Sequence, residues 1–197
     1  MKKYSFIALS ILLTSISCAS TQTEVQNTNQ TIIIEIDENQ KFITYLADEW
    51  EKTLDENPLF ATYTGDKRSN DKITSNSIEE FNSSKKSNLD SYNKLKEIDL
   101  NKLSEDNKLN YKLMEFSLKN NVDANNFPTY YLRLNQRGGI QSFYETGNRL
   151  VYTSKQDYLD WLARLNQFVG NIQNAYIINK EGLKRGHTQP KIVTQGV

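Results

Sequence analysis

The segment SKQDYLDWLARLNQFVGNIQNAYIINKEGLKRG, which spans residues 154–186, carries the strongest structural signal in the chain. Ser154 with Asp157 is typical of a capped helix start, and Gly186 is typical of the left-handed residue at a helix end. The basic pair before Gly186 suits the negative C-terminal end of a helix dipole. Between the caps, apolar residues recur three and four positions apart, and this spacing predicts one long amphipathic helix: Tyr158, Trp161, Leu162, Leu165, Phe168, Val169, Ile172 and Tyr176.

Three more helices are predicted upstream of this segment. The first starts at Asp37, which forms a capping box with Gln40, and it stops before Pro58 because the residue preceding proline avoids the α region. The second starts at Ser77 and the third at Ser104. The expected apolar faces are Ile43, Leu46, Ala47, Trp50 and Leu54 in the first helix, and Ile78, Phe81, Leu89, Tyr92 and Leu95 in the second. The third carries two stripes, which predicts a helix covered on more than one side: Leu109, Leu113 and Phe116, and Tyr111, Met114 and Leu118.

A long connection, residues 125–153, separates the third and fourth helices and shows no helical period. Within it, residues 130–134 alternate weakly, which predicts a short strand or another extended piece. Connections of this length inside a compact domain are usually functional or disordered. The sequence therefore predicts a mainly α fold over residues 37–197, a helical array of about four long helices with an irregular loop insertion.

The N-terminus predicts export from the cytoplasm. Two lysines precede an apolar run over residues 6–16, a layout typical of a secretory signal peptide, here residues 1–17. The run is shorter than the about 20 apolar residues that a transmembrane helix needs. Residues 15–18 resemble a bacterial lipobox, in which the cysteine, here Cys18, is lipidated and becomes the mature N-terminus. Because Ser15 stands where a lipobox usually has Leu, an ordinary signal peptide with an incidental cysteine is the alternative.

Residues 18–36 are expected to form the lipid anchor and a flexible tether, because residues 21–31 are rich in Thr, Gln and Asn and offer almost nothing to bury. The predicted location is the bacterial cell envelope, with the protein exported and lipid-anchored to a membrane. Cys18 is the only cysteine, so no intramolecular disulfide is expected. The 24 basic and 24 acidic residues balance, which argues against nucleic-acid binding.

No catalytic residue and no metal ligand set is predicted in this chain. His187 is the only histidine and follows a helix end, where a surface residue is the simplest interpretation. A zinc site would need its other ligands from carboxylates alone, and the sequence has neither an HExxH motif nor paired histidines. A Ser-His-Asp triad is disfavoured because no G-x-S-x-G elbow is present.

One candidate substrate-binding segment lies in the long connection: Arg133, Gln136, Arg137, Gly138 and Gly139. The glycine pair can adopt positive φ and turn successive backbone N–H groups toward an anion. Arg133 or Arg137 would then hold a carboxylate, such as that of a peptide, through two parallel hydrogen bonds. A tight turn with solvated or salt-bridged arginines is the alternative.

A series of short motifs runs through the chain: LADEW at 46–50, NPLFATYTGD at 57–66, LSED at 103–106, LNY at 109–111, LNQRGG at 134–139, YL at 158–159, LARL at 162–165, EGL at 181–183, RG at 185–186 and PKIV at 190–193. In this order and spacing they resemble the domain-of-unknown-function 885 family of bacterial proteins, which are often exported and often lipoproteins. The resemblance covers essentially everything after about residue 42.

This resemblance implies a mostly helical, zinc metallopeptidase-like protein, similar in overall form to thimet oligopeptidase and carboxypeptidase Taq relatives. It also implies zinc in the complete family protein, bound by an H-E-x-x-x-G-H-type helix that supplies the metal ligands and the general base. That helix is not in this chain. The resemblance therefore implies the N-terminal region alone, whose packing partner would be a missing C-terminal region. A fragment, a frameshift product and a true short protein are all open.

Two functional hypotheses follow. The first is an N-terminal fragment of a lipid-anchored, zinc-dependent peptidase-like protein, catalytically incomplete, whose helices wall one side of a substrate channel. The alternative is a non-enzymatic helical envelope lipoprotein that binds a peptide or protein partner through its apolar faces and the Arg137-Gly138-Gly139 loop.

Overall fold

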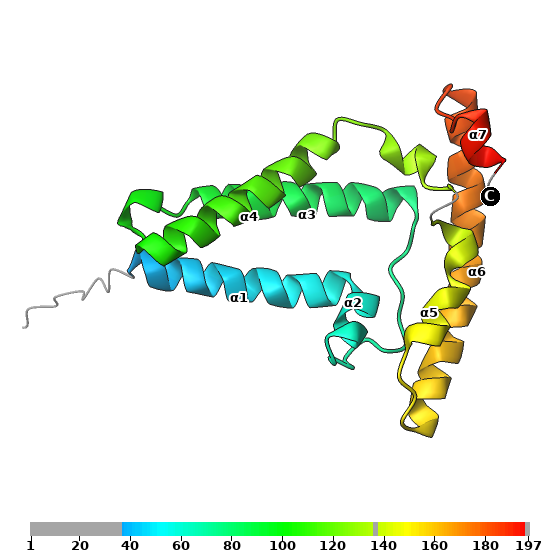
Figure 1. The fold of residues 1–197 in the computed structure, drawn as a ribbon, viewed down its shortest axis with the longest axis horizontal. Coiled ribbons are helices and arrows are strands. Elements are labelled where there is room, and N and C mark those ends of the chain that lie inside the picture. The colour runs from blue at the N-terminus through cyan, green and yellow to red at the C-terminus, as the bar shows by residue number, and fades with distance from the viewer. Residues whose placement is uncertain (1–36, 136–137, 196–197) are drawn as a thin grey trace, which may run out of the picture. The chain divides into compact units, whose positions relative to one another are not determined.

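Helices dominate the part of the chain that the computed structural model describes, residues 37–135 and 138–195 (Figure 1). The four long helices are α1 (Glu38–Glu56), α3 (Ile78–Lys96), α4 (Glu105–Ala124) and α6 (Lys155–Lys184). The shorter ones are α2 (Pro58–Tyr63), α5 (Tyr144–Arg149) and α7 (Lys191–Thr194), with the 3₁₀ turns η1 (Leu100–Lys102), η2 (Thr129–Leu132) and η3 (Ile140–Ser142). No strand occurs within these ranges, so the predicted mainly α class with four long helices is confirmed. The predicted signal peptide, tether and lipidated Cys18 lie outside the described residues.

Serine caps set three of the four long helices. Ser77 Oγ accepts a hydrogen bond from the backbone N–H of Glu80 at 3.1 Å, and Ser104 caps α4 in the same way. Ser154 and Asp157 form the full reciprocal capping box of α6, and the helix ends before Gly186, whose φ of 76° is the left-handed value predicted for it. The capping box predicted at Asp37 is wrong, because its side chain makes no capping hydrogen bond.

The core lies where α1, α3 and α4 run side by side (Figure 1). Phe42 and Tyr111 are almost fully buried there, with ring centroids 6.0 Å apart. Tyr45 donates its hydroxyl to the backbone oxygen of Ser91 at 3.1 Å, and burial raises the pKa of that hydroxyl. The buried cluster comprises Phe42, Tyr45, Leu95, Ile98, Leu103, Tyr111 and Leu118.

The predicted apolar face of α1 is partly wrong. Ile43 and Trp50 are about half exposed, whereas Phe42 and Tyr45 point into the core. The buried face of α1 differs from the predicted one because α3 and α4 both pack on the side of the helix that carries Phe42. Trp50 instead makes an edge-to-face contact with Phe60 of α2, at a centroid distance of 5.8 Å.

Only one of the two stripes predicted on α4 is covered in the described part of the chain. Tyr111 and Leu118 are buried, but Leu109, Leu113 and Phe116 are 60–69% exposed. On α6, likewise, most of the predicted stripe faces outward. The long amphipathic helices therefore retain apolar faces that no described residue covers.

The strand or extended piece predicted at residues 130–134 is wrong, because these residues begin in the turn η2. The turn lets consecutive aromatic rings stack: Tyr130 lies 4.5 Å from Phe81 of α3 and 4.1 Å from Tyr131. Tyr131 in turn stacks on His187 beyond the end of α6, at 5.4 Å. Stacking of these rings, from α3 to the residue beyond the end of α6, thus favours a turn over the strand that the weak apolar alternation predicted.

The core and the outer face of α4 differ in a way that a matched pair of substitutions tests. Phe42→Ala should lower the unfolding free energy by about 3–5 kcal/mol, because it leaves a cavity among buried rings. Phe116→Ala removes a side chain that is 69% exposed and should change stability by less than about 0.5 kcal/mol. Urea unfolding of the full chain, followed by circular dichroism, measures both. Equal losses would contradict the assignment and would mean that Phe116 is covered in solution.

Candidate functional site

One face of α6 holds the loop that connects α2 to α3. At the start of the helix, Asp157 Oδ2 accepts the backbone N–H groups of Thr153 and Ser154, both at 2.8 Å. Lys67 Nζ donates to Asp157 Oδ1 at 2.7 Å. This bond, followed by the one from the Thr153 backbone, holds the pKa of the carboxyl well below its usual range. The carboxylate that caps α6 thus also ties the loop to it.

Arg164 anchors the same loop from inside the protein, with only 1% of its surface exposed. Its guanidinium donates to Lys72 O at 2.9 Å, Thr62 Oγ1 at 2.6 Å, Ser69 O at 3.2 Å and Pro58 O at 3.3 Å. No carboxylate among the described residues forms an ion pair with it. Desolvation lowers the pKa of Arg164 and the nearby Asp160 carboxylate acts in the opposite sense, while every atom that accepts a hydrogen bond from the guanidinium is a neutral oxygen.

Two amides continue this contact one and two turns further along α6. Gln167 donates to Asp71 O at 2.6 Å, and Asn171 donates to Thr74 O at 3.1 Å. Asn171 Oδ1 also accepts the backbone N–H of Asn76 at 3.1 Å. Polar side chains of α6 therefore bind α2 at residues 58 and 62 and the loop backbone between residues 69 and 76.

Asn76 ends this series and carries an unusual acceptor. Its side-chain amide donates to Asn171 O at 3.0 Å, which fixes the orientation of the amide group. The opposite atom, Asn76 Oδ1, is buried without a hydrogen-bond partner within the described chain. Such atoms are few in native proteins. Asn76 also lines two neighbouring cavities, so the loop that Arg164 holds forms part of both walls.

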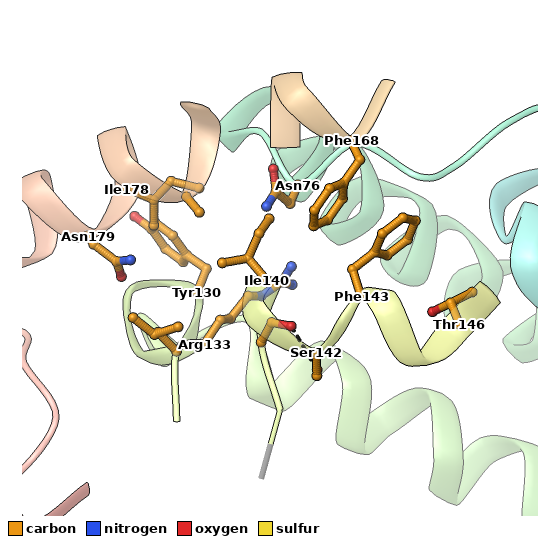
Figure 2. Close-up of a pocket in the computed structure, with 13 residues that line it drawn as sticks. Asn76, Tyr130, Arg133, Ile140, Ser142, Phe143, Thr146, Phe168, Ile178 and Asn179 are labelled. Carbon is orange, nitrogen blue, oxygen red and sulfur yellow. Dashed lines mark hydrogen bonds between the residues drawn. The ribbon is translucent and has the colours of Figure 1, made fainter. Parts of the chain in front are cut away.

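The first cavity, called the apolar cavity below, has a volume of about 330 Å³ (Figure 2). Phe143 and Phe168 stack at 4.0 Å and form one end, while Tyr130 and Ile178 lie at the other (Figure 2). The lining residues are Asn76, Tyr130, Arg133, Leu134, Gly139, Ile140, Ser142, Phe143, Thr146, Phe168, Ala175, Ile178 and Asn179. Most come from the irregular connection and from α6, which together make a concave, mainly apolar surface of the type that holds ligands.

The second cavity, called the polar cavity below, has a volume of about 350 Å³ and lies beside α3. Hydroxyl and amide side chains dominate its wall: Asn57, Thr74, Ser75, Asn76, Ser77, Glu80, Phe81, Ser84, Lys85, Asn88, Asn121, Ala124, Asn125, Thr129 and Arg133. Asn76 and Arg133 line both cavities, so the two share a wall.

Arg133 is an exposed arginine whose guanidinium makes no hydrogen bond or ion pair with another described residue. It lies 5.6 Å from the ring of Phe81, whose face also carries Lys85 Nζ at 4.7 Å. The other described arginines are engaged: Arg68, Arg149 and Arg185 with carboxylates, and Arg164 with the loop. Arg133 therefore offers a free cation at the junction of the two cavities.

The structure brings together two of the predicted substrate-binding residues, Arg133 and Gly139, on the apolar cavity. Gly139 has a φ of 141°, which agrees with the predicted positive value. The N–H of Gly138 donates to Asn135 O at 3.3 Å. The N–H of Gly138 is therefore paired within the chain, and anion binding by the glycine pair stays a prediction. Gln136 and Arg137 lie outside the described residues.

The sequence reasoning missed Arg164 and the two amides as loop anchors. Arg164 lies between Trp161 and Phe168 on the helix face next to the predicted stripe. The sequence offered one signal for this role, because Arg164 is a single charged residue among apolar residues of the same helix face. A buried charge must be paired or hydrogen-bonded, so such a residue predicts polar partners. His187, predicted to be a simple surface residue, is half-buried against Tyr131.

No three His, Cys, Asp or Glu side chains in the described part of the chain lie close enough to hold a metal ion. The zinc that the family resemblance implies therefore has no ligand set among these residues. No helix in residues 37–135 and 138–195 has the length and apolarity needed to cross a membrane.

Fold and site together define a helical protein with a small-ligand cavity between its longest helix and an irregular connection. A family model described as bacterial protein of unknown function (DUF885) matches residues 58–197. The chain belongs to this family. The match includes α6, the loop that it holds and the Gly138-Gly139 pair of the connection, whereas α1 precedes it. No curated protein and no solved structure gives a significant match to the chain.

The clamp around Arg164 predicts a large stability effect. Arg164→Ala removes the donor for two loop carbonyls and for one carbonyl and one hydroxyl of α2, which should cost about 3 kcal/mol or more of unfolding free energy. Arg149→Ala breaks an exposed pair with Glu145 and should cost less than about 1 kcal/mol. Urea unfolding of both variants and the unchanged chain gives the comparison. A loss of unfolding free energy in Arg164→Ala no larger than that in Arg149→Ala would show that water replaces the guanidinium and that Arg164 does not hold the loop.

Proposed function

We propose that this chain is the peptide-binding helical region of a lipid-anchored, peptidase-like protein of the bacterial envelope. The observation that carries the proposal is the free guanidinium of Arg133 on the rim of the apolar cavity. A peptide offers what such a site binds, namely apolar side chains joined by polar groups that accept hydrogen bonds. The family resemblance supports the peptidase-like character and the form similar to thimet oligopeptidase.

Hydrolysis is not assigned to the described residues. The zinc, its ligands and the general base expected of the complete family protein belong to a motif that this chain does not contain. Its contribution is substrate binding: the cavity receives a side chain, and Arg133 holds a carbonyl or carboxylate beside it.

Filling the cavity tests the proposal directly. Ala175→Phe places a ring in the apolar cavity and should weaken binding of a peptide containing one phenylalanine by about tenfold or more, equal to about 1.4 kcal/mol. Asn166→Phe adds the same ring at an exposed position on α6 and should leave binding unchanged. Fluorescence anisotropy measures both, with two dye-labelled peptides that carry phenylalanine at the carboxyl end or in the middle. If neither peptide binds the unchanged chain, the proposed function is wrong.

The lipid anchor is the second part of the proposal. Cys18 follows the predicted signal peptide at the position that a lipobox requires. Cys18→Ala should abolish incorporation of a labelled fatty acid and release the protein from the membrane fraction. The unchanged chain should incorporate the fatty acid and stay in the membrane fraction. Labelling that persists in Cys18→Ala would contradict lipidation and leave an ordinary signal peptide. The labelling is measured in cells of a bacterium that expresses the full chain.

The exposed face of α6 favours an alternative function, binding of a helical partner. Six apolar residues alternate four and three positions apart and are 37–65% exposed: Tyr158, Leu162, Leu165, Val169, Ile172 and Tyr176. This is the spacing of a coiled-coil seam, which a second helix would cover. In a larger peptidase-like protein, the partner would be the C-terminal region, and in a non-enzymatic lipoprotein it would be a separate protein. Peptide binding that survives Ala175→Phe but is lost in Leu162→Gln/Val169→Gln would favour this alternative.

A further inference from the structure

We infer that the apolar and polar cavities form one bipartite site that selects the carboxyl-terminal end of a peptide. The last side chain, large and apolar, enters the apolar cavity, its free carboxylate pairs with Arg133, and preceding neutral or acidic residues lie along the polar cavity. This inference rests on the proposed peptide-binding function and names the end of the substrate that is recognised.

The shared wall supports a single site. Asn76 and Arg133 line both cavities, so a ligand that contacts Arg133 can extend into each of them. The loop carrying Asn76 is held by Asn171 of α6, and the ring of Phe81 backs the guanidinium of Arg133. Both junction residues are therefore positioned before any ligand arrives.

Arg133 specifies the kind of ligand group. A guanidinium that has no hydrogen-bond or ion-pair partner among the described residues, on the edge of an apolar surface, matches a carboxylate through two parallel hydrogen bonds. A peptide presents a carboxylate directly beside a side chain only at its carboxyl-terminal residue or at acidic residues. The apolar lining selects the former, because an acidic side chain would leave the cavity empty.

The apolar cavity sets the size of the last residue. Its volume of about 330 Å³ lies at the small end of the range for ligand pockets, so it suits one large side chain and not a long ligand. Phe143 and Phe168 stack with an interplanar angle of 11°, and their edges and faces suit a further aromatic ring. Phenylalanine is therefore the preferred last residue.

The polar cavity sets the character of the residues before it. Its amides and hydroxyls can both donate to and accept from peptide groups. Once Arg133 pairs with the terminal carboxylate, the charged residues left in the polar cavity are Lys85 and Glu80, and Lys85 makes no ion pair with a carboxylate of the described residues. Lys85 is also held in place, because it donates to Asn125 O at 3.0 Å. An acidic residue before the last position can thus pair with Lys85 while Arg133 holds the terminal carboxylate.

The test compares three dye-labelled peptides on the full chain by fluorescence anisotropy: Gly-Asp-Ser-Asp-Phe with a free carboxylate, the same peptide amidated, and one with the phenylalanine in the middle. The free carboxylate should bind about 10- to 100-fold more tightly than the amide, the range expected for a charge-assisted pair. Arg133→Gln should remove this preference, while Arg149→Gln, which changes an exposed arginine outside both cavities, should keep it. Lys85→Gln should weaken binding and reduce its salt dependence.

Each outcome decides a different claim. Equal binding of the free and amidated peptides would overturn selection of the carboxyl-terminal end while leaving peptide binding intact. A preference that survives Arg133→Gln would overturn the role of Arg133. Displacement of the peptide by decanoate with equal affinity would show that the site recognises any apolar carboxylate and would overturn its assignment to peptides. Absence of binding by all three peptides would overturn the proposed function as well.

Discussion

The buried guanidinium of Arg164 is the constraint on which the candidate site depends. A charge that is 99% shielded from water must be solvated by the protein, and here the oxygens of the α2–α3 loop provide that solvation. The dependence is mutual. The loop has little regular structure of its own, so without Arg164 its carbonyl at Lys72 would have to find another donor. The buried guanidinium of α6 and the loop carbonyls that accept from it therefore each depend on the other for their hydrogen bonds.

This constraint reaches the cavities through a short chain of contacts. Arg164 and Gln167 fix the loop along α6, and Asn171 then fixes Asn76, whose position defines the wall shared by both cavities. On the other side, stacking of Tyr130 on Phe81 holds the turn that leads to Arg133. Two independent networks, one polar and one aromatic, therefore position the junction residues. The cavity geometry is a consequence of the fold more than of any single lining residue.

Local chemistry in the sequence was sufficient for the helices but not for their environment. Serine caps at Ser77, Ser104 and Ser154 act within a few residues, so they predicted three helix starts correctly. Burial depends on partners far along the chain. For this reason the sequence misplaced the buried face of α1. The site shows the same division: the positive φ of Gly139 followed from a local pattern, whereas the role of Arg164 depends on carbonyls about 90 residues away, outside the reach of pattern reasoning.

The two faces of α6 explain why one helix carries so much apolar surface. Phe168, Ala175 and Ile178 line the apolar cavity on the face that also holds the loop. The neighbouring face carries the exposed seam of Leu162 and Val169. A helix clamped on one face is held in a fixed position and orientation, and this lets its other face present a regular surface. A partner that packs on the seam would therefore contact the element that forms the cavity wall. Peptide binding and partner binding are in this sense compatible, because α6 gives each of them a separate face.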